Sequence, residues 1–397
     1  MPPLPPAGKP PSPLPTVPLR RWDIFCQVID NFGDAGVCWR LARQLAGEYG
    51  VAVRLWVDDP APLHKLFPAL DPVRESQLCL GVEVCRWTPM FPQTEPADAV
   101  IEAFGCRLPE NYVAAMAARD PKPHWLNLEY LSAEGWVEGC HGLPSPHPSL
   151  PLLKHFFFPG FTAQTGGLLR EAGLLARRDA FQGDAGERAA FWASLGWAMP
   201  APEALTVSLF CYANPAVPAL LATWAGAPSP VVCCVAEGQP AAAVAAALGR
   251  TSLLPGETVH DGNLTLRILP FLEQDAYDRL LWACDCNFVR GEDSFVRAQW
   301  AGKPLVWQAY PQEEDAQEAK LAAFLDRYCA ALPEDAAADL RRLWLGWNRG
   351  TLTAPLWEDW CARRATLECH ARAWADGLTK NSDLAAALVN FCNAMIK

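Results

Sequence analysis

The first segment with residue types suited to chemistry is the turn from Asp30 to Gly36, which reads DNFGDAG. Asp30 and Asp34 are carboxylates that can accept a proton or hold a cation. Gly33 and Gly36 allow a sharp bend and a close approach to a ligand, and free amides at the start of a following helix can bind an anion or a polar sugar. We therefore expect a ligand-binding turn whose carboxylates point into a cleft.

Two alternatives apply to this turn. Asp34 is also a favoured residue for capping a helix, because its side chain can accept hydrogen bonds from backbone N–H groups. The turn has no third glycine before the helix and so departs from a dinucleotide fingerprint. A nicotinamide cofactor is disfavoured.

A second candidate turn runs from Arg290 to Ser294 (RGEDS) and follows a predicted strand. Its helix start, with Ser294 as the predicted N-cap, and Arg290 suit a diphosphate. Glu292 and Asp293 do not suit an anion, so we expect them to face a cation or donor hydroxyls. A site for a nucleotide diphosphate, a sugar and a cationic acceptor would use all these groups. In the structural alternative, the acids cap the helix and pair with Arg290 and Arg297.

Aromatic residues follow other predicted strands at the same edge, namely Phe210, Tyr212, Phe271 and Tyr310. Flat side chains there can stack on a nucleobase or cover a sugar. For any one of them, packing within the core is the alternative role. Tyr310 opens the polar turn 310–315.

These turns need parallel strands to position them. Hydrophobic periodicity predicts strands at 23–29, 51–57, 82–87, 99–104 and 125–128, and a second series at 205–211, 231–235, 264–269, 286–289 and 304–307. Helices are predicted at 35–49 and 111–118. Strand and helix alternate in both halves, which is typical of an α/β fold with two Rossmann-like domains facing across a cleft at the carboxyl ends of their strands.

The expected domains are a Pro-rich disordered tail (1–20), a first Rossmann-like, acceptor-binding domain (21–165) and a helical linker (166–202). A second, nucleotide-sugar-binding domain (203–375) and a C-terminal helix (376–397) that packs back on the first domain complete the chain.

The net charge of -11 disfavours nucleic acid and suits a basic protein partner. No membrane span or signal peptide is predicted, so we expect a cytoplasmic protein. Fifteen cysteines without a Cys-x-x-Cys pair indicate buried thiols, and no metal site is expected, since Cys140, His141 and His147 fall short of a zinc ligand set.

The runs from Asp23 to Arg43 and from Phe288 to Pro304 resemble the elongation factor P arginine rhamnosyltransferase family, and the resemblance extends from residue 22 almost to the C-terminus. It implies an inverting GT-B glycosyltransferase with two facing Rossmann-like domains. The implied donor is dTDP-β-L-rhamnose, and the implied acceptor is an arginine of translation elongation factor P. No cofactor, metal, nucleic acid or membrane is implied.

The resemblance also implies roles for individual residues. Asp34 matches the general base and Asp30 a second essential aspartate. On chemical grounds, Asp30 or Glu292 would hold the other N–H groups of the acceptor guanidinium, so Glu292 is counted with the catalytic carboxylates. The implied donor-binding residues are Asn31, Phe32, Gly33, Phe210, Tyr212, Phe271, Gln274, Arg290, Glu292, Asp293, Ser294 and Tyr310.

An aspartate cannot deprotonate a free arginine, because a pKa gap of about eight units costs roughly 11 kcal/mol. It can accept the proton late, once the nitrogen bonds to the sugar. The competing readings are a GT-B transferase with another donor or acceptor, a nucleotide-sugar epimerase, and a non-catalytic partner of a translation factor.

Overall fold

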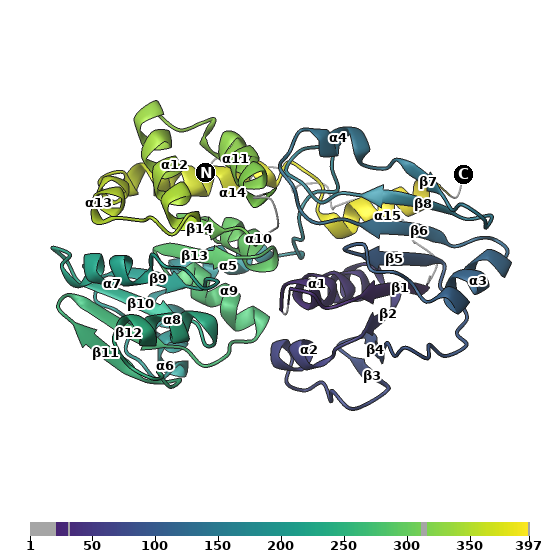
Figure 1. Cartoon of the computed structure of the whole chain (residues 1–397), viewed down its shortest axis with the longest axis horizontal. Coiled ribbons are helices and arrows are strands. Elements are labelled where there is room, and N and C mark those ends of the chain that lie inside the picture. Colours follow the sequence, from purple (N-terminus) through teal and green to yellow (C-terminus); the bar gives the residue numbers. More distant parts are fainter. Residues whose placement is uncertain (1–20, 31, 311–315, 396–397) are drawn as a thin grey trace, which may run out of the picture.

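The structure is a computed structural model that describes residues 21–30, 32–310 and 316–395. The predicted tail 1–20, the predicted donor contact Asn31 and most of the turn after Tyr310 lie outside these residues. Two sheets, each covered by helices, lie side by side in Figure 1. The expected α/β class is confirmed.

The first sheet has eight strands in the order β3-β4-β2-β1-β5-β6-β8-β7. Its six inner strands are parallel, and β3 and β7 pair antiparallel at the two edges. The strands are β1 (Arg21–Cys26), β2 (Ala52–Val57), β3 (Ser76–Cys79), β4 (Val82–Arg86), β5 (Ala99–Ala103), β6 (His124–Leu128), β7 (Pro144–Pro146) and β8 (Leu153–Phe157). The helices among them are α1 (Phe32–Tyr49), α2 (Ala61–Leu66), α3 (Glu110–Ala118) and α4 (Trp136–Cys140).

The second sheet has six strands in the order β11-β12-β10-β9-β13-β14, again parallel except for the edge strand β11. The strands are β9 (Leu205–Leu209), β10 (Val231–Val235), β11 (Thr258–Asp261), β12 (Leu264–Ile268), β13 (Cys286–Arg290) and β14 (Leu305–Gln308). The helices that alternate with them are α7 (Val217–Ala225), α8 (Gln239–Ala247), α9 (Gln274–Ala283) and α10 (Asp293–Ala301).

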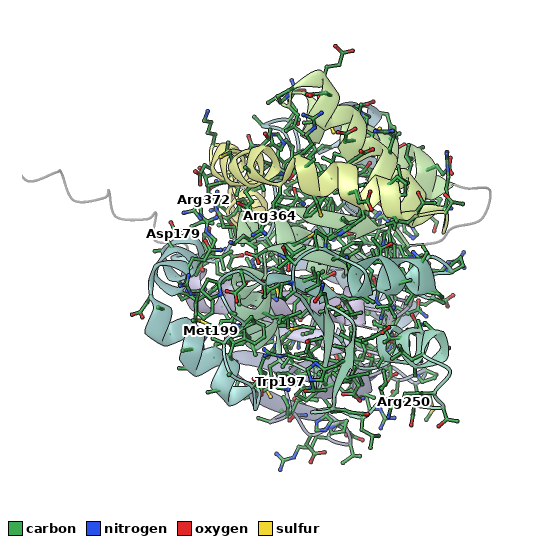
Figure 2. The ribbon with its side chains drawn as sticks, turned by 90° about the vertical axis from the view of Figure 1, so that its left-hand side faces the viewer. Asp179, Trp197, Met199, Arg250, Arg364 and Arg372 are labelled. Carbon is green, nitrogen blue, oxygen red and sulfur yellow. The ribbon has the colours of Figure 1, made fainter. Side chains whose placement is uncertain are left out.

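Helices before and after the second sheet complete its domain. They are α5 (Leu174–Gly183), α6 (Ala185–Ser194), α11 (Ala316–Cys329), α12 (Glu334–Asn348), α13 (Ala354–Ala362) and α14 (Arg364–Leu378). Arg372 of α14 and Asp179 of α5, both labelled in Figure 2, form an ion pair of 2.6 Å. This pair joins the helices that precede the second sheet to those that follow it.

The last helix, α15 (Leu384–Ala394), packs on the first domain (Figure 1). Its Leu384 and Leu388 are buried in the same hydrophobic cluster as Ile24 of β1 and Leu41 of α1. The chain therefore passes between the domains twice, once after β8 and once before α15.

The observed elements differ from the expected ones mainly at edges. The strand predicted at 23–29 ends at Cys26, because the next N–H groups bond to carboxylates instead of a neighbouring strand: Val28 N donates to Asp58 Oδ1 and Ile29 N to Asp34 Oδ2, both at 2.9 Å. The antiparallel edge strands β3, β7 and β11 were not predicted, nor was β8. The first helix begins at Phe32, three residues before its predicted start.

Cysteine and tryptophan side chains mostly fill the cores. Twelve of the fifteen cysteines are buried. Trp39, Trp192, Trp224, Trp300 and Trp344 are among the largest fully buried side chains. The predicted packing role of both residue types is confirmed for these positions.

Candidate functional site

A cavity of about 720 Å³ opens between the two domains, at the carboxyl ends of β1, β9, β12 and β13. Both acidic turns line it. Among the described residues, those predicted from sequence that line it are Asp30, Phe32, Gly33, Phe210, Tyr212, Phe271, Gln274, Arg290, Glu292, Asp293, Ser294 and Tyr310. The structure thus brings together residues up to 280 positions apart in the sequence.

Asp34 lies behind the cavity wall. It is 2% exposed and does not line the cavity. Its Oδ2 accepts hydrogen bonds from the backbone N–H groups of Ile29 (2.9 Å) and Asp30 (2.8 Å). The expectation that the carboxylates of this turn point into the cleft therefore holds for Asp30 and is wrong for Asp34. Asp34 does not cap the following helix either, because both N–H groups that it binds belong to residues that precede it in the sequence.

Burial raises the pKa of Asp34, and the two amides and the hydroxyl of Tyr130 oppose this shift. Neither amide engages Oδ1. No sequence motif indicated Tyr130, which stacks on Phe104 with ring centroids 4.6 Å apart. Asp34 is thus a carboxylate held in a fixed orientation at the back of the turn.

Asp30 contacts the second domain directly. The hydroxyl of Tyr212 donates to Asp30 Oδ2 at 3.0 Å. A side chain at Gly291 would collide here, since a Cβ atom would lie 2.9 Å from that oxygen and 3.1 Å from the Tyr212 hydroxyl. Burial raises the pKa of Asp30 to about 6, against the opposing effects of this hydrogen bond and the charge of Arg290.

Arg290 occupies a fixed place on the opposite wall. Its guanidinium carbon lies 4.5 Å from the ring centroid of Phe210 and 4.4 Å from that of Tyr212, and Nη1 donates to Gln239 Oε1 at 2.6 Å. A guanidinium held over two aromatic faces keeps its charge and most of its donors for an anion. The sequence did not single out Gln239, which starts α8.

Ser294 is not the N-cap of α10. The helix begins at Asp293 after Glu292, with no side-chain capping bond. Ser294 Oγ instead donates to the carbonyl oxygen of Arg290 and accepts from the Arg290 N–H at 3.2 Å. Both bonds are local to the turn, so Ser294 stabilises the bend that places Arg290 and Glu292.

Glu292 lies partly buried at the interface of the domains. Its Oε2 accepts a hydrogen bond from the backbone N–H of Leu131, in the first domain, at 2.9 Å. Burial raises the pKa of Glu292 to about 8, and the nearby negative charge of Asp34 adds to the shift. A cation placed between these two carboxylates would relieve this cost.

Asp293 pairs with Arg40 of α1, at 2.9 Å between Arg40 Nε and Asp293 Oδ1. The structural alternative, pairing of the acids with Arg290 and Arg297, is therefore wrong for this carboxylate. Gln274 Nε2, which donates to the carbonyl oxygen of Gly36 at 3.1 Å, is a further contact between the domains at this point.

Aromatic rings from both domains line the cavity. Phe32 of the first domain and Phe271 of the second have ring centroids 5.0 Å apart, and Tyr310 meets Tyr212 edge to face at 5.4 Å. The cavity walls also include Lys65 and the segment Ala236–Gln239, for which the sequence offered no motif.

The two histidines near Cys140, His141 and His147, accept hydrogen bonds from backbone N–H groups. His141 Nδ1 accepts the N–H of Phe158 at 3.0 Å, and His147 Nδ1 accepts that of Leu150 at 3.1 Å. In the described part of the chain, no group of three or more His, Cys, Asp or Glu side chains is arranged to hold a metal ion. No described helix has the length and apolar character needed to span a membrane.

Comparisons with known proteins point in one direction. A family model described as elongation factor P (EF-P) rhamnosyltransferase EarP matches residues 22–393. The chain is 51% identical to a protein-arginine rhamnosyltransferase of Pseudomonas putida over 370 residues, covering 93% of this chain and 98% of the relative. It is also 51% identical to the enzyme of the same name from Pseudomonas aeruginosa, covering 94% and 99%.

The fold comparisons agree. A solved structure concerned with EarP-mediated arginine glycosylation of translation elongation factor EF-P superposes with a TM-score of 0.67 at 38% identity, covering 94% of this chain and 99% of that one. A UDP-glucosyltransferase from Polygonum tinctorium superposes with a TM-score of 0.50 at 10% identity, covering 96% and 99%, which bears on the fold alone. The GT-B architecture expected from the resemblance is confirmed.

Proposed function

This chain belongs to the EarP family of elongation factor P rhamnosyltransferases, and on that basis we propose that it transfers L-rhamnose from dTDP-β-L-rhamnose to an arginine of elongation factor P with inversion at the anomeric carbon. The observation that carries the proposal is the family match over residues 22–393. The acids Asp30 and Glu292, which face the cavity shared by both domains, supply the physical support.

The second domain holds the donor. The start of α10 and Arg290 face the diphosphate, because backbone N–H groups and a guanidinium stabilise the negative charge that develops on the leaving group. Phe210, Tyr212, Phe271, Gln274 and Tyr310 surround the nucleoside and sugar. Phe32 and Gly33 approach the donor from the first domain. Asp293 and Ser294 complete the set that the family resemblance assigns to the donor.

The first domain binds the acceptor, an arginine side chain of elongation factor P. Its planar guanidinium fits between Asp30 and Glu292, whose raised pKa values fall when a cation enters. One guanidinium nitrogen attacks the anomeric carbon from the face opposite the diphosphate. The new C–N bond forms as the C–O bond to the diphosphate breaks, and dTDP leaves with the bonding electrons.

Asp34 accepts the proton that the nitrogen loses in this step. Before the reaction the arginine pKa exceeds 12, so transfer occurs late, when bonding to carbon has made the proton acidic. Because Asp34 is buried, the acceptor nitrogen reaches it only after entering the turn between Ile29 and Gly33. Tyr130 and the two amides hold the carboxylate for this contact.

The test is a transfer assay with elongation factor P and dTDP-β-L-rhamnose, read by mass spectrometry of the intact factor. We expect a gain of one deoxyhexose, and NMR of the product should show the α anomer. An acceptor with Lys in place of the arginine should stay unmodified, because an ammonium lacks the planar fork that the acids recognise. Complex formation without any gain in mass would contradict the proposal, as would equal transfer from UDP-glucose.

A further inference from the structure

Arg40 of α1 crosses from the first domain into the second. Its side chain is 1% exposed, and its fork binds Asp278 of α9 through two hydrogen bonds, from Nη1 at 3.2 Å and from Nη2 at 3.1 Å. Arg40 Nε is 2.9 Å from Asp293 Oδ1, and Nη1 is 3.7 Å from Glu171 Oε1. One buried guanidinium of the first domain is thus surrounded by three carboxylates that follow the first sheet in the sequence: Glu171 before α5, Asp278 of α9 and Asp293 of α10.

The second domain supplies a single guanidinium to the same cluster. Arg297 of α10 donates from Nε to Asp278 Oδ1 at 3.0 Å and from Nη1 to Glu171 Oε2 at 2.7 Å. With Arg40 present, two positive charges meet three negative ones. Without Arg40, Arg297 alone would face Asp278, Asp293 and Glu171, and burial makes such an excess of negative charge costly.

Asp293 belongs to both this cluster and the cavity. Its side chain is 15% exposed and lines the cavity wall at the start of α10. A diphosphate bound at that helix start would lie a few ångströms from its carboxylate. At such distances in a partly desolvated site, the repulsion between two negative charges is weakly screened and opposes binding. The donor site therefore needs a positive charge close to Asp293.

Arg40 is the arginine with a direct ion pair to Asp293 in the described residues. Arg297 is turned toward Asp278 and Glu171, and Arg290 toward Gln239. The charge of Arg297 also acts on Asp293, without a direct ion pair, so the arginine in contact with Asp293 comes from the first domain.

We propose that Arg40 is a positioning residue of the donor site, which neutralises Asp293 across the domain interface and so makes tight binding of a nucleoside diphosphate depend on contact between the two domains. This inference rests on the proposed function. It also explains how two acidic residues stand beside a diphosphate: Asp293 is compensated from the other domain, and Glu292 is turned toward Leu131.

Arg43 provides a matched control. It lies one turn further along α1 and also reaches α9, with Nη2 3.7 Å from Asp275 Oδ2. The two side chains of that pair are 31% and 74% exposed, so water screens their interaction. Arg43→Met removes a cross-domain arginine of the same helix without touching Asp293.

The experiment is a double-variant cycle on the full chain with dTDP as the probe, measured by titration calorimetry. Arg40→Met should weaken dTDP binding by about tenfold or more, whereas Arg43→Met should change it by less than about twofold. In the double variant Arg40→Met/Asp293→Asn, binding should return to within about threefold of the Asp293→Asn single variant, because the uncompensated charge is gone. Arg40→Lys, which keeps a positive charge near Asp293, should bind dTDP at least about threefold more tightly than Arg40→Met.

Two results would overturn the inference. One is unchanged dTDP affinity in Arg40→Met. The other is a double variant that binds no better than Arg40→Met, which would mean that Arg40 acts through packing alone. If Arg40→Met does not fold, Arg40→Lys and Arg40→Gln replace it in the experiment. An equal loss of dTDP affinity in these two variants would also contradict a charge effect. If the parent chain binds UDP and not dTDP, the proposed donor is wrong, and the same cycle with UDP still decides the role of Arg40.

Discussion

The two acidic turns of the cavity differ in how their charges are compensated. In the β1–α1 turn, the carboxylate of Asp34 accepts backbone amides and that of Asp30 accepts a tyrosine hydroxyl. In the β13–α10 turn, Asp293 is paired with a buried arginine. No ion pair of Asp30, Asp34 or Glu292 occurs among the residues that the structure describes.

Because of this difference, one side of the cavity suits a cationic group and the other side suits an anionic group. Acids that are desolvated and form no direct ion pair favour a cationic substrate, which is what an arginine acceptor supplies. The one paired acid stands at the helix start, where an anionic diphosphate fits. The arrangement of charge thus predicts which substrate lies against which residue.

The largest expected effect comes from Asp34→Asn, which removes the proton acceptor of the first turn and preserves its shape. The turnover number for rhamnose transfer should fall by about a thousandfold, as is typical for loss of a general base. Binding of dTDP, which the other turn governs, should change little. Single-turnover mass spectrometry and calorimetry measure the two quantities. If transfer persists, the first turn is not the catalytic side.

Gly291→Ala should disturb the point where the two turns meet. The residue has a φ of 62°, and the new methyl group would press on Asp30 and Tyr212. We expect kcat/KM to fall about thirtyfold. Gly249→Ala is the control, because Gly249 has a similar φ of 67° with no atom within 4 Å of a Cβ. It should lose about 1 kcal/mol of stability and keep its activity.

Tyr212→Phe should sharpen the role of Asp30 through its pH dependence. If ionised Asp30 binds the acceptor, kcat/KM of the parent rises with pH through about 6. The Tyr212 hydroxyl lowers the pKa of Asp30, so its removal should shift this limb to higher pH. Below pH 6 the variant should be about fivefold less active than the parent, and above pH 8 nearly equal to it. An unshifted limb in the pH profile would separate Asp30 from acceptor binding.

The smallest expected effect is that of Glu292→Gln on the free energy of unfolding. The pKa of Glu292 is about 8 in the folded chain against an ordinary 4.5, so the folded state binds more protons than the unfolded one between these values. The stability of the parent therefore declines as pH rises from about 4.5 to 8, and Gln removes this decline. Thermal melting should show the variant gaining about 1 kcal/mol relative to the parent between pH 7 and pH 8. A gain that shrinks over this range would contradict the assigned burial of Glu292.

Much of the parallel framework was predictable because its signals are local. A buried strand such as Val231–Val235 is a continuous apolar run, and α1 follows β1 at the spacing of a crossover unit. Edge strands were missed because Ser76–Cys79 and Thr258–Asp261 are short and mostly exposed, so no face imposes alternation on them.

The site was predictable only in part, for a related reason. Residues that follow strands, such as Asp30, Tyr212 and Arg290, are placed at the cavity by the topology alone. Which groups they bond to depends on residues far away in the chain. Arg40 and Asp293 are separated by 253 positions, and nothing in the local sequence of either one indicates the other. For the same reason, the inward turn of Asp34 and the local bonding of Ser294 emerged only from the fold.

The return of α15 to the first domain bears on how the protein is made. Leu384, Leu388 and Val389 belong to the hydrophobic cluster of the first sheet, and the backbone N–H of Leu384 bonds to the carbonyl oxygen of Leu168 at 3.0 Å. These residues follow the whole second domain in the sequence, so the core of the first domain cannot be completed until the second domain has been synthesised. The two halves must therefore mature together, and a protein cut short before residue 384 would leave an apolar surface for chaperones and proteases to find.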